Sequence, residues 1–199
     1  RDRSVSRGLG DVYKRQIEDT PIVFIGAGNL ATNLAKALYR KGFRIVQVYS
    51  RTEESARELA QKVEAEYTTD LAEVNPYAKL YIVSLKDSAF AELLQGIVEG
   101  KREEALMVHT AGSIPMNVWE GHVSHYGVFY PMQTFSKQRE VDFKEIPFFI
   151  EASSAEDAAF LKAIASTLSN RVYDADSEQR KSLHPVSYTH LRAHETLSD

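Results

Sequence analysis

The sequence predicts an α/β fold in which helices cover both faces of a doubly wound, mainly parallel β-sheet. Three observations predict it. Strand-like and helix-like segments alternate at intervals of about 20–30 residues along the chain. The strand-like segments are continuous apolar runs, which is typical of strands buried on both faces. The first run ends at a glycine-containing turn that opens a helix.

The first half of the chain supplies the clearest elements. Apolar, β-branched runs predict strands at 21–25, 44–49, 66–68 and 80–85. Helical periodicity predicts helices at 30–41, from 52 to about 63, and briefly between 70 and 76. Gly42 stands where a helix-terminating glycine belongs, and Thr52 and Asp70 stand where N-caps belong.

The second half repeats the pattern. Strands are expected at 105–109, 127–130, 146–150 and 171–173. Asp87 is expected to cap a helix that reaches Ile97, and Ser153 or Ser154 to cap one that reaches Leu168. A last helix is expected to start at Asp176 and to lose its pattern at 184–185.

Composition excludes several classes of protein. The absence of cysteine removes disulfides, thiolate zinc sites and cysteine nucleophiles, and it fits a reducing cytoplasm. No apolar run reaches the roughly 18 residues of a membrane span, and the basic N-terminus lacks the apolar core of a signal peptide. The formal charge of −4 divides into +3 over 1–16, −1 over 186–199 and −6 between them. An acidic body argues against nucleic acid as a partner.

The two ends differ from the middle. Residues 1–16 and 186–199 show no sustained period of 2 or 3.6, and we expect 1–16 to be disordered. His190 and His194 have the i, i+4 spacing of metal ligands on a helix. No cap or apolar face would hold a helix there, so we expect a frayed polar tail and no metal site.

The strongest motif is the glycine turn G-x-G-x-x-A, formed by Gly26, Ala27, Gly28, Asn29, Leu30 and Ala31. Gly26 permits the tight turn, Gly28 lets the backbone approach a pyrophosphate, and Ala31 allows close packing of helix on strand. Free N–H groups at the helix start would face the phosphates. A plain glycine turn is the alternative, but the position between a strand and a helix favours a dinucleotide site.

The residues at the end of the second predicted strand indicate which dinucleotide would bind. Sites that prefer NAD(H) place a carboxylate here to hold the ribose 2′-hydroxyl. This chain has Ser50, Arg51 and Thr52 instead. A guanidinium between two hydroxyls suits a 2′-phosphate, so we expect NADP(H) in preference to NAD(H). Alternatively, Arg51 is solvated and Thr52 only caps a helix, and the carboxylates of Glu53 and Glu54 could repel a phosphate.

Polar residues follow three of the predicted strands, where the carboxyl ends of a parallel sheet converge. Ser84 and Lys86 are candidate cofactor contacts, and Lys86 could also orient a substrate. His109 is the candidate proton donor, with a structural histidine as the alternative. Gln133 is a candidate for orienting a small-molecule substrate, and the candidate substrate-lining residues are Ser113, Tyr130 and Gln133.

Other function classes are less well supported. No G-x-S-x-G elbow is present, so a hydrolase triad is not indicated. A methyltransferase-like nucleotide site would need an acceptor for the ribose hydroxyls after the second strand. A dinucleotide-binding sensor or scaffold without chemistry stays open, because the catalytic constellation is weak.

Five segments together resemble a known group of proteins: GAGNLATNLAKAL, YSRT, IVSLKDSAF, HTAGSIP and GVFYPMQTFSK. They are similar to bacterial proteins in which a Rossmann-like domain precedes a helical domain of unknown function. That group is distantly similar to pyrroline-5-carboxylate reductase, prephenate dehydrogenase and deazaflavin-dependent NADP reductase. The resemblance, over about 17–184, implies a Rossmann fold, NADP(H) binding and an oxidoreductase activity with no assigned substrate. Our first functional hypothesis is hydride transfer between the nicotinamide and a small carbonyl or imine.

The resemblance also implies a domain organisation. The tracts DVYKRQ and VSYTHLRAHETLSD look like translated sequencing-adapter sequence, so 1–16 and 186–199 are expected to be non-native. Residues 17–175 would form the Rossmann-like domain and 176–185 the start of the helical domain. In the full-length protein that helical domain would supply homodimer contacts and the far wall of the substrate pocket, so this chain is expected to bind cofactor yet could be inactive.

Overall fold

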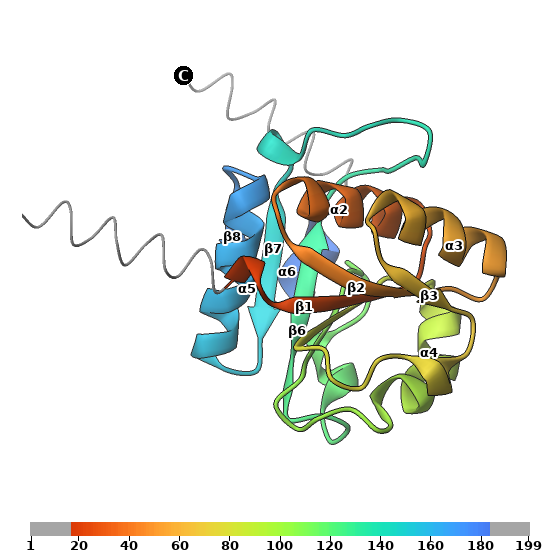
Figure 1. The fold of residues 1–199 in the computed structure, drawn as a ribbon. Coiled ribbons are helices and arrows are strands. Elements are labelled where there is room, and N and C mark those ends of the chain that lie inside the picture. The colour runs from red at the N-terminus through yellow and green to blue at the C-terminus, as the bar shows by residue number, and fades with distance from the viewer. Residues whose placement is uncertain (1–16, 184–199) are drawn as a thin grey trace, which may run out of the picture.

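A computed structural model describes residues 17–183 (Figure 1). Within that range eight strands form one sheet in the order β3-β2-β1-β4-β5-β6-β7-β8. The strands are β1 Pro21–Ile25, β2 Arg44–Tyr49, β3 Glu66–Thr68, β4 Leu80–Val83, β5 Leu106–His109, β6 His125–Pro131, β7 Phe148–Ala152 and β8 Val172–Asp174. Strands β1 to β6 are parallel, β7 runs antiparallel to β6, and β8 runs parallel to β7.

Helices cover both faces of this sheet. The helices are α2 Asn29–Arg40, α3 Glu53–Lys62, α4 Asp87–Val98, α5 Ala155–Leu168 and α6 Ser177–Ser182, with the 3₁₀ turns η1 Leu71–Glu73, η2 Met116–Trp119 and η3 Phe143–Glu145. Helices α2, α3 and α5 pack with Ile22 and Phe24 of β1, whereas α4 and η2 pack with Val23 and Ile25. The alternation explains why β1 and β4 are apolar along their whole length, and it confirms the expected α/β fold.

The order of the strands fixes where a ligand site can form. From β1 the chain winds outward through β2 to β3, then returns beside β1 and winds the other way through β4, β5 and β6. Neighbouring loops therefore diverge at the carboxyl ends of β1 and β4, which opens a crevice there. The glycine turn leaves β1 at this same point.

Several predicted boundaries need correction. Strand β4 ends at Val83 rather than at residue 85, because the chain then turns into α4. Strand β6 is longer than expected, and β7 starts at Phe148 instead of 146. Asp87 is the first residue of α4, and Lys86 occupies the N-cap position. Thr52 does precede α3, but its side chain makes no capping hydrogen bond.

Other helix starts follow the sequence signals. Ser154 caps α5 by accepting a hydrogen bond from the N–H of Asp157, and Asp176 and Gln179 form a reciprocal capping box at α6. Across residues 17–183 no helix is long and apolar enough to cross a membrane. The same residues contain no group of three or more His, Cys, Asp or Glu side chains suited to a metal ion. His190 and His194 lie outside the described residues.

Candidate functional site

The glycine turn is wedged between three strand ends. The N–H of Gly26 donates to the carbonyl of Tyr49 at 2.8 Å, and the N–H of Ser84 donates to the carbonyl of Ile25 at 2.8 Å. Gly26 has φ +115°, and a Cβ there would lie 2.0 Å from the carbonyl oxygen of Ser84. A side chain at this position is impossible without moving β4, so Gly26 is required by the fold.

Gly28 is a glycine for a different reason. Its φ of −78° suits any residue, and an added Cβ would meet nothing within 4 Å. Gly28 and Asn29 are exposed, whereas Ala31 is fully buried against the strand. The first turn of α2 carries no acidic residue. The fold leaves an open cradle before a helix N-terminus without negative charge, and this fits a phosphate-bearing ligand.

The end of β2 lies beside this cradle. Ser50 is half-buried, and Arg51 and Thr52 are exposed. Arg51 forms no ion pair with any residue in 17–183, so its guanidinium is available to a ligand. The carboxylate of Glu53 accepts a hydrogen bond from the hydroxyl of Tyr67 at 3.3 Å. That contact holds Glu53 toward β3, and this reduces the repulsion expected between its carboxylate and a bound phosphate.

The loops that follow β4 and β5 are joined by a hydrogen bond. The hydroxyl of Ser113 donates to Oδ2 of Asp87 at 2.8 Å. Ser84 is half-buried beside the glycine turn, and Lys86 is exposed at the start of α4. Ser113 and Lys86 therefore lie on adjacent loops at the carboxyl edge of the sheet, as the sequence predicts for groups that face the same ligand.

Tyr130, on β6, packs against the loop that follows β5. A Cβ on Gly112 would lie 2.8 Å from Cζ of Tyr130, so the phenol ring and the loop after β5 are in close contact. Burial raises the pKa of the Tyr130 hydroxyl, and the nearby Arg180 partly opposes that shift. Gln133 is exposed on the loop after β6, and no contact joins it to the other predicted site residues in the described range.

His109 is buried, with only 1% of its surface exposed. Its Nδ1 accepts a hydrogen bond from the N–H of Ala111 at 3.1 Å, and its ring packs on Phe90 and Trp119. Burial, with the charge of Arg180, lowers the pKa of His109 to about 4. The imidazole is therefore neutral at pH 7 and shielded from solvent. Of the two interpretations that the sequence left open, these contacts favour the structural histidine over the proton donor.

Arg180 is a residue that sequence reasoning missed. It lies on α6, and its side chain is completely buried. One Nη atom pairs with Oε2 of Glu151 at 2.5 Å, and the other donates to the carbonyl of Ile114 at 2.8 Å. Within residues 17–183, Nε of Arg180 and Nε2 of His109 have no hydrogen-bond partner. A charged residue on a short polar helix gives no local signal of burial, because only the tertiary fold brings Glu151 to it.

A further hollow in the described part of the chain lies elsewhere. It is a groove of about 720 Å³ between the carboxyl ends of α2 and α5, and Arg40, Lys144 and Asn170 contribute to its lining. Helix α2 runs about 18 Å away from the glycine turn before it reaches Arg40. The groove therefore lies beside the end of α2 that is farther from the glycine turn, and we do not assign the candidate site to it.

Comparisons with known proteins agree with this geometry. Residues 21–112 match the family model described as NADP oxidoreductase, coenzyme F420-dependent. The crystal structure of a "putative NADP oxidoreductase" from Bacteroides fragilis is 91% identical in sequence, with a TM-score of 0.85 over 91% of this chain. This chain covers 70% of that protein. A search of curated proteins gave no match.

More distant structures share the fold. Prephenate dehydrogenase from A. aeolicus, in complex with hydroxyphenyl propionate and NAD+, is 15% identical with a TM-score of 0.70. Arogenate dehydrogenase from Synechocystis is 17% identical with a TM-score of 0.71. In each pair 82% of this chain aligns with 62% of the dehydrogenase. These matches confirm the Rossmann-like fold expected from the sequence.

Proposed function

This chain belongs to the family of NADP oxidoreductases that the Bacteroides fragilis protein represents, and from that membership we propose that it binds NADP(H) for hydride transfer to or from a small carbonyl or imine. It is a Rossmann domain of the pyridine-nucleotide oxidoreductase type. The observation that carries the proposal is Gly28, which has empty space around it at the start of a helix, beside the point where the strand order reverses.

The residues of the site divide into two groups by the part of the cofactor they would hold. The N–H groups of residues 28–31 would bind the pyrophosphate. Arg51 would bind the 2′-phosphate, with Ser50 and Thr52 donating hydrogen bonds to the same group. The unused hydroxyl of Thr52 and the unpaired guanidinium of Arg51 within the described chain support NADP(H) over NAD(H).

The substrate side is formed by the loops after β4, β5 and β6. When bound, the nicotinamide ring would supply or accept the hydride. Ser113 and Tyr130 would orient the substrate, and Lys86 and Gln133 are exposed and free to do the same. His109 would support the loop after β5 from beneath, through its hydrogen bond to Ala111. This chain spans 70% of its Bacteroides relative, so the full set of substrate contacts belongs to the longer protein.

Calorimetric titration of the chain with NADPH and with NADH tests the cofactor assignment. We expect NADPH to bind about tenfold more tightly, because a charge-assisted phosphate contact of roughly 1.5 kcal/mol would be lost with NADH. Arg51→Ala should remove most of that difference. Arg102→Ala, which changes an exposed arginine near the amino end of β5, should leave it unchanged. Equal affinity of the unmodified chain for both cofactors would refute the role of Arg51.

A binding protein without chemistry is the second candidate, and the burial of His109 favours it. The neutral, enclosed imidazole leaves no histidine at the carboxyl edge of the described sheet to donate a proton. Turnover of NADPH by the longer Bacteroides relative, with a panel of keto and imino acids, separates the two candidates. Turnover supports the enzyme, whereas tight cofactor binding without turnover of any substrate in the panel supports the sensor.

A further inference from the structure

The loop that follows β6 is fixed to the helix of the glycine turn. Asn33 on α2 is buried, with 4% of its surface exposed. Its Nδ2 donates to the carbonyl of Ser136 at 2.9 Å and to the carbonyl of Asn29 at 2.8 Å. A segment more than 100 residues away in sequence is therefore held beside the start of α2.

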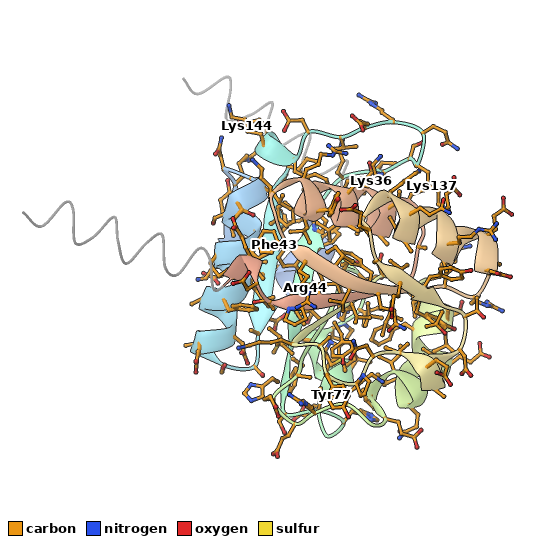
Figure 2. The ribbon with its side chains drawn as sticks, viewed as in Figure 1. Lys36, Phe43, Arg44, Tyr77, Lys137 and Lys144 are labelled. Carbon is orange, nitrogen blue, oxygen red and sulfur yellow. The ribbon has the colours of Figure 1, made fainter. Side chains whose placement is uncertain are left out.

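Lys137 follows directly after this anchor. Figure 2 shows it over α2 and α3, far from Lys144 on η3. It is half-buried and lines a small hollow between the two helices, together with Ala27, Thr32, Ser55, Glu58, Leu59 and Lys62. One carboxylate and two ammonium groups thus face this hollow, which leaves it positive. Lys137 forms no ion pair with any residue between 17 and 183.

The neighbours of Lys137 come from both parts of the candidate cofactor site. Ala27 and Thr32 belong to the glycine turn and the first turns of α2, and the hydroxyl of Thr32 donates to the carbonyl of Ala27 at 3.3 Å. Ser55 lies in the first turn of α3, three residues after Thr52. A lysine at this place lies between the helix that follows the glycine turn and the helix that follows Arg51 and Thr52.

We propose that Lys137 is a second determinant of cofactor specificity, which binds the 2′-phosphate from the side opposite Arg51. The inference rests on the proposed function, since it assigns a further contact to the same cofactor. A phosphate dianion is better neutralised by two cations than by one, and the long stem of lysine lets its ammonium group follow the phosphate. Without a 2′-phosphate the ammonium group has no partner on the ligand, so Lys137 would add little to NADH binding.

Calorimetric titrations of the whole chain test this inference. NADPH, NADH, adenosine 2′,5′-bisphosphate and 5′-AMP are each titrated into the unmodified protein, Lys137→Ala and Lys144→Ala. We expect Lys137→Ala to weaken NADPH and the bisphosphate by about tenfold. NADH and 5′-AMP should change by less than about twofold. Lys144→Ala, an exposed lysine later on the same segment, should change none of the four affinities.

The outcomes separate the inference from the function on which it rests. Failure of the unmodified chain to bind either NADPH or NADH would overturn both. Binding of NADPH that Lys137→Ala leaves unchanged would overturn only the role of Lys137. An equal loss for NADPH and NADH would also overturn it, because Lys137 would then act on a group that both cofactors share. Circular dichroism of the three proteins confirms that each is folded.

Discussion

Gly26 and Gly28 are glycines for different structural reasons. Gly26 is fixed by the carbonyl of Ser84, whereas Gly28 has open space and ordinary backbone angles. The motif alone does not distinguish them, because sequence spacing says nothing of what surrounds each Cα. The structure assigns Gly26 to folding and leaves Gly28 to be explained by a ligand.

Substitution of Gly28 should therefore separate stability from binding. In Gly28→Asp the carboxylate would cap α2, so we expect Tm to stay within about 4 °C of the unmodified protein or to rise. The same carboxylate would repel a phosphate, and NADPH affinity should fall by at least about tenfold. Thermal melting and calorimetry measure the two effects, and Gly28→Ala controls for charge. Full NADPH affinity in Gly28→Asp would mean that the cradle holds no phosphate.

The burial of His109 predicts how the stability of the protein depends on pH. Its pKa is lowered to about 4 in the folded state, by burial first and by Arg180 second. The unfolded chain takes up a proton near pH 6.5, so the stabilising contribution is complete above that pH and is lost as the pH falls toward 4. We expect a loss of about 3 kcal/mol of unfolding free energy across this window.

Denaturant titrations between pH 4 and 7.5 measure that loss. His109→Gln does not titrate and can still accept from the N–H of Ala111, so its stability should fall less steeply across the same window. The difference between the two profiles isolates His109 from the carboxylates that also titrate. Parallel profiles for the two proteins would show that His109 is not buried as a neutral group.

Among the helices and strands, apolar runs in the sequence predicted the positions of the strands. They did not predict strand direction or the role of the polar residue Asp87. Strands β1, β2 and β3 were expected at their observed positions. The signal for β1 and β2 is a short run rich in apolar and β-branched residues. The antiparallel direction of β7 carries no local signal, since strand direction depends on how the loop from 132 to 147 crosses the sheet. Asp87 was expected to cap α4, but one residue of shift turns its carboxylate to Ser113.

Helix α6 shows what the sequence could not supply. Its start at Asp176 was expected, but nothing in the sequence marked Arg180 as a buried residue. In the fold its Arg180 reaches Glu151 of β7 and the carbonyls of Ala175 and Ile114. This one side chain attaches the helix to β7 and to the loop after β5.

Removal of Arg180 should loosen that attachment. Arg180→Ala leaves Glu151 without its partner, and we expect a loss of about 2–4 kcal/mol of unfolding free energy. Arg180→Met with Glu151→Leu removes both charges and should regain part of it. Urea denaturation of the three proteins gives the comparison. A loss below about 0.5 kcal/mol for Arg180→Ala would contradict the buried ion pair.

At the scale of the whole molecule, two hollows compete for a ligand. The crevice at the carboxyl edge joins Gly28 to the ends of β2 and β4, and the groove near Lys144 lies at the other end of α2. The open glycine, the reversal of strand order and the unpaired Arg51 within the described chain favour the crevice. The expected homodimer through a further helical domain stays a prediction for the longer protein.

A dinucleotide site at the glycine turn can be located by NMR. Backbone amide NMR shifts of the whole chain, followed while NADPH is added, report where the cofactor binds. We expect saturable shifts at residues 28–31, at 50–52 and at 84–86, with smaller shifts at 136–138. Saturable shifts confined to Arg40, Lys144 and Asn170, or no saturable shifts at all, would contradict a dinucleotide site at the glycine turn.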